Sequence, residues 1–537
     1  MQLDLRFPPY LPIILSEDGR WVAYLSPGNP YLGFQTWKSS RARPLRIAFD
    51  PQLRLDCPAV AEVRLNTECR DEIIPILRAL QHIYGRPELR DQLLDAVAQD
   101  VNAITRADQG RRGMDYWPIL VLGAVRLGCN FDYDRLQNLA EEHRSLRRIM
   151  GIDGWCDDQT FDWRCLRDNI TLLSPDTLER LNHLIVAEGH RLIPHAVHAV
   201  RCDSFVVAAD IHYPTDSGLI GDGLRIILRT SQRLADLLGQ AGWRQHRHLR
   251  QVVKTHLRTI NRIAAGQGRD FRKRLQAAYQ ELLDVADRII ARASALLEPA
   301  LFSIGLGPEV KTVERLRTKL LDFLNMTIHA CDQARRRVLA EETVANDEKL
   351  FSLFEPETQL IKRGKVSQPV EFGHRVLIVE DGAGFVCHYA VLRRGADDRE
   401  VVVGEMKQVQ QRLQGQIRSA SFDRGFHSPE NQAELAKLVG QPCLPKPGHV
   451  QAAEQEHEAT VEFREARRRH PGVESTIGAL QSGNGQVRCR DHTFGGYCRY
   501  VGLGVLGRNL HVLGKVLISR ADPKCVAGQS RRGRQAA

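Results

Sequence analysis

Three acidic residues, Asp203, Asp423 and Glu474, occupy positions at which the neighbouring sequence gives a carboxylate a defined place. Asp203 lies inside the β-branched run Val200–Val207. An acid within such a strand is costly unless something pairs with it. A divalent metal ion is the natural partner, because hard cations take carboxylate oxygens as ligands.

Asp423 follows a short run, Ile417–Phe422, that reads as a strand. Gly425 permits a turn, and a helix then begins with Ser428 as its N-cap and Pro429 in its first position. Asp423 is therefore expected where a strand gives way to a helix, which is where open α/β sheets build their sites.

Glu474 is predicted in the first turn of a helix that begins at Pro471, since proline has no intrahelical hydrogen bond to lose there. Val473, Ile477 and Leu480 recur at helical spacing and form the expected buried stripe. Glu474 would lie beside this stripe, at the edge of the core. The alternative is an acid placed in the first turn only because the helix dipole stabilises it.

Three further acids, Asp210, Asp216 and Asp222, follow Asp203 closely and compete with it as the first acid of a site. Asp203 is preferred because it lies in the strand itself. Asp216 comes after Pro-Thr in a loop, where it is equally suited to capping a turn.

Four segments together resemble bacterial insertion-sequence transposases of the ISNCY type, which are DDE transposases with an RNase H-like catalytic fold. The segments are CDSFVVAADIHYPTDSGLIGDG, SLFEPETQLIKRGKVSQPVEFGHRVLIVED, SFDRGFHSPEN, and RRRHPGVESTIGAL with RYVGLGVLGRNLHVLG. They occur in the family's order over about residues 110–515. The resemblance implies that Asp203, Asp423 and Glu474 are the metal-binding catalytic acids.

The same resemblance implies Mg²⁺ as the cofactor, with Mn²⁺ as a possible substitute. Two such ions about 4 Å apart can stabilise both the attacking and the leaving oxygen of a phosphodiester. Water would cleave the element end, and the freed 3′-hydroxyl would attack target DNA. The expected partners are double-stranded DNA, as element ends and target, and further copies of the chain in a homodimer or larger assembly.

The composition agrees with a partner that carries negative charge. The net charge is +10, and 43% of the residues are hydrophobic. No apolar run near 18 residues, no signal peptide and no C-x-x-C pair is apparent, so we expect a cytoplasmic, nucleoid-associated protein without a membrane segment.

A basic run between Ala241 and Gln280 contains ten Lys or Arg residues and one acid. A solvated helix face usually mixes both signs, so contact with DNA is the preferred interpretation and a solvated face the alternative. The candidate DNA-binding residues of this run are Arg247, Arg250, Lys254 and Arg258.

Three more residues are candidates for DNA contact. Lys362 and Lys365 belong to a K-x-G-K-like segment that the family shares, although an exposed strand end would explain them equally well. His470, one turn before Glu474, would contact the scissile phosphate or a strand end, or else anchor its helix.

The predicted fold is an α/β RNase H-like core with a large all-helical insertion, preceded by a mainly helical N-terminal region. The expected parts are residues 1–105 without an assigned role, a helical DNA-binding or assembly domain at 106–195, the core at 196–223 and 351–525, the insertion at 224–350, and a basic tail at 526–537. Two other functions remain open: an RNase H-like nuclease without strand transfer, and a catalytically silent DNA-binding repressor.

Overall fold

The computed structural model describes residues 46–49, 57–105, 113–154, 158–266, 268, 270–302, 310–362, 370–448 and 452–521, with two short strands before them. The chain divides into two compact units, residues 1–45 with 108–112, and residues 46–107 with 113–537. In the first unit, β1 (Ile13–Leu15) and β2 (Trp21–Ala23) pair antiparallel. All other described elements belong to the second unit. The basic tail expected at 526–537 lies outside the described residues.

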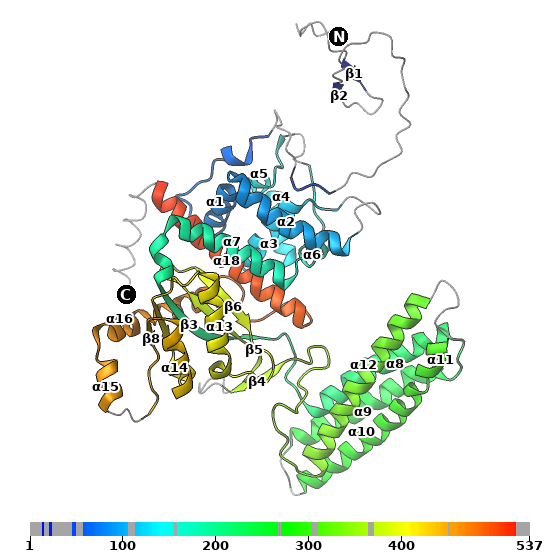
Figure 1. Ribbon diagram of the computed structural model, residues 1–537. Helices are drawn as coiled ribbons and strands as arrows, with labels where there is room; N and C mark the ends of the chain where they lie inside the picture. Colours follow the sequence, from blue (N-terminus) through cyan, green and yellow to red (C-terminus); the bar gives the residue numbers. More distant parts are fainter. Residues whose placement is uncertain are drawn as a thin grey trace. The chain divides into compact units, whose positions relative to one another are not determined.

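The second unit is mostly helical and contains a six-stranded mixed sheet (Figure 1). Its strands are β3 (Ala199–Ala208), β4 (Gln359–Lys362), β5 (Val370–Glu380), β6 (Val386–Val391), β7 (Ser419–Phe422) and β8 (Gln441–Cys443). Their order is β4-β5-β3-β7-β8, and β6 also pairs with β5. β3 pairs antiparallel with β5 and parallel with β7, so it is an interior strand. The α/β expectation is confirmed at this level.

Local sequence signals account for the connections of the sheet. β5 and β6 form a hairpin, and its turn places Gly384 at φ +89°, which favours glycine. Helices α13 (Asp398–Arg412) and α14 (Pro429–Leu438) connect β6 to β7 and β7 to β8. Ser428 caps α14 as expected, because its hydroxyl accepts the Asn431 N–H at 3.0 Å.

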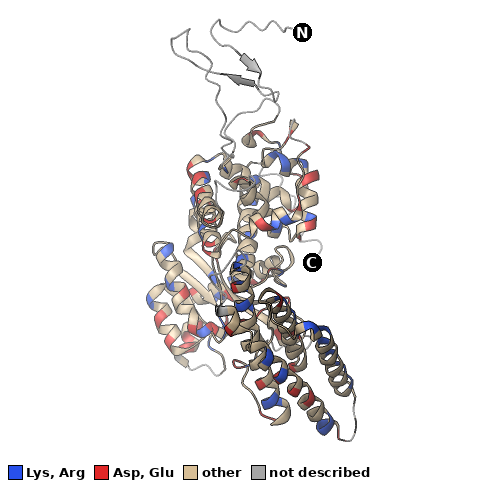
Figure 2. Ribbon diagram, turned by 90° about the vertical axis from the view of Figure 1, so that its right-hand side faces the viewer, with Lys and Arg blue, Asp and Glu red and all other residues tan. Residues whose placement is uncertain are grey.

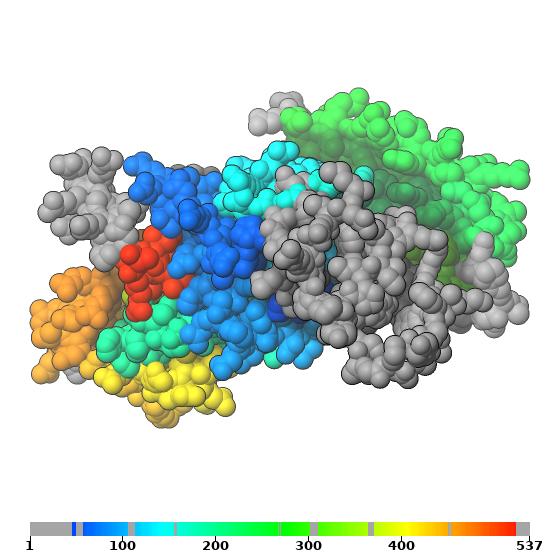
Figure 3. All heavy atoms as spheres, turned by 90° about the horizontal axis from the view of Figure 1, so that it is seen from above, coloured from blue at the N-terminus to red at the C-terminus, as the bar shows by residue number. Residues whose placement is uncertain are grey.

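Helices before the sheet and the last helix share one hydrophobic core with the sheet. These helices are α1 (Ile73–Tyr84), α2 (Pro87–Ile104), α3 (Tyr116–Gly128), α4 (Tyr133–Glu142), α5 (Arg144–Ile149), α6 (Trp163–Ile170), α7 (Pro175–Leu192) and α18 (Phe494–Ala521). α18 packs against α1, α3 and α7. Figure 3 shows the end of α18 beside α1, in red and blue. The chain therefore closes this core with elements from opposite ends of the sequence.

α18 is, among the described helices, the one long and apolar enough to cross a membrane by length and composition. The sequence interpretation, which found no apolar run near 18 residues, overlooked it. Its most apolar 18-residue window has a mean hydropathy of 1.3, and 72% of that window is buried inside the fold. The hydrophobicity of α18 is thus accounted for by its contacts with α1, α3 and α7.

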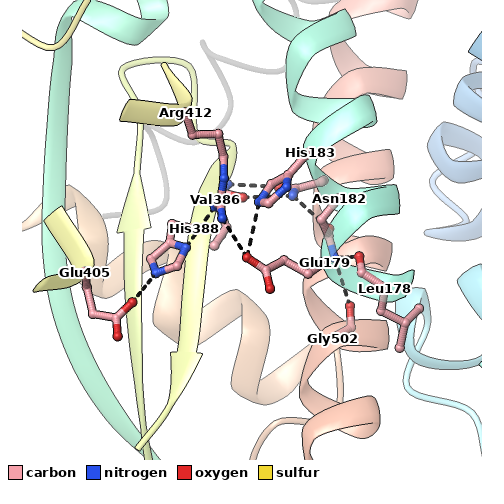
Figure 4. A network of polar contacts seen from close by, with 10 residues as sticks. Leu178, Glu179, Asn182, His183, Val386, His388, Glu405, Arg412 and Gly502 are labelled. Carbon is pink, nitrogen blue, oxygen red and sulfur yellow. Dashed lines mark hydrogen bonds and ion pairs between the residues drawn. The ribbon is translucent and has the colours of Figure 1, made fainter. Parts of the chain in front are cut away.

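Polar side chains connect the sheet to α7 (Figure 4). Arg412 on α13 donates to Nδ1 of His388 on β6 at 3.0 Å and to Oε1 of Glu179 on α7 at 2.7 Å. The other ring nitrogen of His388 lies 2.6 Å from Oε2 of Glu405. These bonds fix α13, which follows the hairpin, against α7.

Asn509 on α18 pairs with strand β6 through its side-chain amide. It is fully buried, accepts the Val386 N–H at 2.8 Å, and donates to the Val386 carbonyl at 3.0 Å and to Asn182 at 3.1 Å. The amide thereby satisfies two backbone groups at the edge of the sheet.

Asn509→Ala is expected to lower the free energy of unfolding by about 2–4 kcal/mol, because both Val386 backbone groups would be buried without partners. Urea unfolding measures this change. Asn261→Ala, at an exposed position on α9 (His246–Ala264), is the matched control and is expected to change stability by less than about 0.5 kcal/mol. Equal effects of the two substitutions would contradict the role assigned to Asn509.

A helical bundle lies between β3 and β4 in the sequence and has its own hydrophobic core. Its helices are α8 (Asp216–Leu237), α9, α10 (Phe271–Ser294), α11 (Leu297–Phe302), α12 (Val310–Ala334) and the π-helical η5 (Arg335–Leu339). The insertion expected at 224–350 is thus mostly helical in its described residues, although residues 340–350 form no helix and α8 begins earlier, at Asp216. Thr215 caps this start by accepting the Gly218 N–H at 3.1 Å. Gly223 then lies within α8, where a Cβ would approach Oγ1 of Thr327 to 2.1 Å.

The remaining elements are short or follow β8. They are η1 (Val60–Glu62), η3 (Pro194–His198), η4 (Trp243–Gln245), η6 (Arg424–Phe426), α15 (Ala452–Glu458), α16 (Val461–Arg469) and α17 (Gly472–Ser482).

Candidate active site

Asp203 lies in the interior strand β3, as the sequence predicts, and is half-buried. Its Oδ1 accepts the N–H of Ser204 at 2.7 Å. Among the described residues, Oδ2 of Asp203 has no hydrogen bond. One carboxylate oxygen therefore remains available to a ligand.

Asp423 follows β7 directly and lies beside Asp203. The parallel register pairs Cys202 with Phe422, so Asp203 and Asp423 are the next residues along two adjacent strands. Asp423 is exposed, and its Oδ1 accepts the Arg424 N–H at 2.7 Å at the start of η6. Residues 220 positions apart in the numbering are thus brought together by the pairing of two strands.

Glu474 lies in the first turn of α17, which packs against β3. Pro471 is the N-cap residue of this helix, Val473 and Leu480 are buried, and Ile477 is partly buried against the core. The carboxylate of Glu474 is exposed. Both the predicted helix and its buried stripe are confirmed.

Three residues that the sequence interpretation missed, Arg201, Glu380 and Thr476, hold α17 against the sheet together with Arg508. Arg201 on β3 donates to the Arg469 carbonyl at 3.3 Å and pairs with Glu380 at 3.0 Å. Thr476 on α17 donates to Oε1 of the buried Glu380 at 2.6 Å and accepts from Arg508 at 3.3 Å. Arg201 shares a strand face with Asp203, two residues on, and this spacing was the one signal available in the sequence.

Close packing at the start of α17 explains why the segment RRRHPGVESTIGAL has a glycine at position 472. A Cβ on Gly472 would lie 1.9 Å from Nη1 of Arg201. Any larger residue would displace the arginine that ties this helix to β3. Gly472 is therefore required by the approach of helix and strand.

The acids influence one another electrostatically. Burial raises the pKa of Asp203 to about 6; the Ser204 hydrogen bond opposes this rise, and the charges of Asp423, Asp398 and Glu474 add to it. Asp398, in the first turn of α13, accepts from the Ser204 hydroxyl at 3.1 Å and pairs with Arg375 at 3.2 Å. The site thus carries an excess of negative charge around a partly buried carboxylate.

At pH 7, Asp203→Asn is expected to raise the free energy of unfolding of the metal-free protein by about 2–3 kcal/mol. Because the folded-state pKa lies above the ordinary value of 3.8, the folded protein holds this proton more tightly than the unfolded chain. Below about pH 4 the ionisable carboxyl of Asp203 therefore does not lower the free energy of unfolding. The loss of stability grows as the pH rises to about 6 and is largest above that pH.

Urea unfolding at pH 4 and pH 7 measures this difference. The exposed Asp210, which pairs with Arg488 at 3.5 Å, provides the control Asp210→Asn, for which little change is expected at either pH. An Asp203→Asn variant with no gain in stability at pH 7 would contradict the electrostatic description of the site.

The three acids suit a hard divalent cation, because such cations prefer oxygen ligands and all three side chains end in carboxylate oxygens. In the part of the chain that the structure describes, however, no three His, Cys, Asp or Glu side chains converge closely enough to hold a metal ion. The expectation of a ready-made metal cluster is therefore not confirmed. Asp203 and Asp423 each direct one oxygen to the next backbone N–H, which turns their carboxylates toward their own strands.

His470 lies with the acids. Its Nδ1 is 3.1 Å from the hydroxyl of Ser421, the β7 residue opposite Arg201. Burial lowers the pKa of His470, while the charges of Asp423 and Glu474 act in the opposite direction. Within the described residues its Nε2 has no hydrogen bond. One ring nitrogen thus anchors the residue, and the other remains available.

The other candidate DNA-binding residues lie elsewhere. Lys362 is exposed at the end of β4 opposite Val370, whereas Asp203 pairs with Ile378, about 25 Å further along β5. Lys365 lies outside the described residues. Four exposed cations follow the surface of α9: Arg247, Arg250, Lys254 and Arg258.

Asp216, a competitor for the role of first acid, belongs to the bundle. It is buried, receives two hydrogen bonds of 2.8 Å from Arg337, and accepts a third from Gln333 at 2.7 Å. Its charge is thus compensated within the bundle. The structure brings together Asp203, Asp423, Glu474 and His470.

No family model, curated protein or solved structure matches this chain.

Proposed function

We propose that the chain is a DDE transposase with an RNase H-like core, which cleaves DNA at insertion-sequence ends and joins them to target DNA. The observation that carries the proposal is the alignment of Asp203 and Asp423 on adjacent parallel strands, with Glu474 on a helix packed against the first strand. The mixed sheet supports the same assignment, since its interior strand carries the first acid. The four segments that resemble the ISNCY-type enzymes contain all three acids.

In this proposal Asp203, Asp423 and Glu474 would hold Mg²⁺ after the carboxylates of Asp203 and Asp423 turn away from the backbone N–H groups that they now accept from. When bound, the metal supplies stabilisation of charge on the attacking and leaving oxygens of the phosphodiester. A divalent cation would also relieve the repulsion that helps to raise the pKa of Asp203. The cluster of Arg201, Glu380 and Thr476 keeps Glu474 on the same side of the sheet as Asp203.

His470 would position DNA at the acids. Burial keeps its imidazole neutral near pH 7, and the Ser421 contact fixes one nitrogen. The free Nε2 can then donate to a phosphate or to a strand end. This role combines the two that the sequence left open for His470.

The bundle would hold DNA through α9. Arg247, Arg250, Lys254 and Arg258 follow one another at three- or four-residue steps, so they form a stripe along one helix face (Lys and Arg are blue in Figure 2). Among the described residues, none of them makes an ion pair. Arg335 and Arg336 of the same bundle, by contrast, pair with Asp287, Glu342 and Glu348. Unpaired cations in a row suit the regular phosphates of duplex DNA.

The test is a strand-transfer assay with the full-length protein, a DNA fragment carrying the ends that flank its coding sequence, and a supercoiled target plasmid. Mg²⁺-dependent cleavage at the ends and joined products are expected, with neither in EDTA. Cleavage without joining would favour a nuclease, and binding without cleavage a repressor. Joined products formed in EDTA would contradict the metal-dependent mechanism.

A further inference from the structure

A pocket of about 100 Å³ lies where the loop after β3 enters the bundle. Its lining combines aromatic rings from three segments with basic side chains at its edge: Tyr213, Phe351 and Phe372, with Arg337 and Lys349. The volume holds several water molecules. A flat ring therefore fits it better than a large ligand.

The aromatic wall is unusual because one member is exposed. Tyr213 has 81% of its surface exposed, more than any other large hydrophobic side chain that the structure describes. Its ring contacts Phe372 at a centroid distance of 5.8 Å, and Phe372 contacts the buried Phe351 at 5.4 Å. Pro214 follows Tyr213 and restricts its backbone to extended conformations. Tyr213 is thus presented to solvent on a stiff segment backed by two further rings.

The charge at the edge of the pocket is positive. The carboxylate of Asp216 is already paired with Arg337. Lys349 remains on the lining, with its Nζ 3.2 Å from the Asn346 side chain, and Lys362 lies on β4 two residues beyond the lining residue Leu360. Burial lowers the pKa of Lys349, and the charges of Arg337 and Lys362 lower it further, while Asp216 opposes them. An anion at this edge would relieve the repulsion among these cations.

We propose that this aromatic pocket binds one unstacked base of a DNA strand, with the flanking phosphates against Lys349 and Lys362. Every base has a π-face and every linkage a charge, so exposed aromatic rings beside cations suit single-stranded nucleic acid. The inference takes DNA as the polymer from the proposed function. It adds a base-binding site that is separate from the acids.

The position of the pocket indicates how far the bound base would lie from the cleaved linkage along the DNA. The N–H of Ala209, the residue after β3, donates to the carbonyl of the lining residue Phe372 at 2.9 Å. The pocket therefore lies next to the C-terminal end of β3, the strand that carries Asp203. That end lies about 20 Å from Asp203 along the strand. If the DNA between the two sites is duplex, with a rise of about 3.4 Å per nucleotide, the unstacked base would lie roughly six nucleotides from the cleaved linkage.

The experiment compares two labelled oligomers of equal length binding to the full-length protein in EDTA, followed by fluorescence anisotropy. One is oligothymidylate, and the other has the same backbone with abasic sugars. Tyr213→Ala is expected to weaken oligothymidylate binding about 5- to 100-fold and to leave abasic binding unchanged. Tyr213→Phe keeps the ring and is expected to bind both as the wild type does.

Lys349→Gln supplies the complementary control. It removes a cation that would bind a phosphate, so it is expected to weaken both oligomers by the same factor. Wild-type affinity of Tyr213→Ala for both oligomers, or equal losses of affinity for both, would overturn the base-binding site. Since no metal is present, these results do not depend on catalysis, and an absence of strand transfer would leave them unaltered.

Discussion

Asp203→Asn, Asp423→Asn and Glu474→Gln are each expected to reduce cleavage of element ends by about a hundredfold or more, while DNA binding remains close to wild type. Each substitution keeps the size of the side chain and removes the charge that would hold Mg²⁺ at the reacting phosphate. Loss of a single stabilising group in a catalytic site commonly costs that much. The measurement is the rate of end cleavage at saturating Mg²⁺, with binding followed separately.

Asp210→Asn and Asp222→Asn serve as controls, because these acids follow Asp203 closely yet pair with Arg488 and Arg225. Cleavage by both controls is expected at the wild-type rate. A catalytic acid whose replacement leaves the rate unaltered would have to be removed from the proposed site. Loss of cleavage in the Asp210→Asn control would give that acid the role of Asp203.

Replacement of Arg247, Arg250, Lys254 and Arg258 together by glutamine is expected to weaken duplex DNA binding strongly at low salt. The dependence of affinity on salt concentration should flatten as well, by up to about one unit of slope for each phosphate that the variant no longer neutralises. Anisotropy titrations over a range of salt concentrations measure both effects. The physical reason is that each of these cations would neutralise a phosphate and release a counterion from the DNA, because none of the four has an ion-pair partner among the described residues.

A matched set of cations tests whether position or total charge matters. Lys311, Arg315 and Lys319 are exposed on α12 of the same bundle. Their replacement by glutamine should change the salt slope much less for each charge removed. Equal effects for the two sets would show that α9 is an ordinary solvated face.

Local signals in the sequence predicted much of the site. Ser428 indicated the start of α14, Pro471 the start of α17, and the β-branched run around Asp203 the strand β3. Each of these signals acts within a few residues, through a cap, a restricted φ or a side-chain alternation. The elements that carry the three acids could therefore be placed without a structure.

Long-range packing could not be predicted in the same way. Arg201, Glu380 and Thr476 meet only because β3, β5 and α17 pack together, and no local pattern marks them. The start of α8 at Asp216 was missed because the preceding Pro214 and Thr215 suggested a loop. Gly223 is accommodated there by its contact with Thr327, and the sequence gives no sign of that contact.

The bundle also has a consequence for the order of folding. β3 and β5 pair across the whole insertion, so closing their ladder early would mean closing a very long loop. The first and last long helices of the bundle, α8 and α12, pack against each other, so a bundle that has already folded brings the two ends of the insertion together. Loop-closure entropy grows with the logarithm of length, and a tenfold shorter effective loop removes about 2 kcal/mol from its cost. We therefore expect helical signals from the bundle to appear before the sheet forms during refolding, so that the insertion guides the pairing of the strand that carries Asp203.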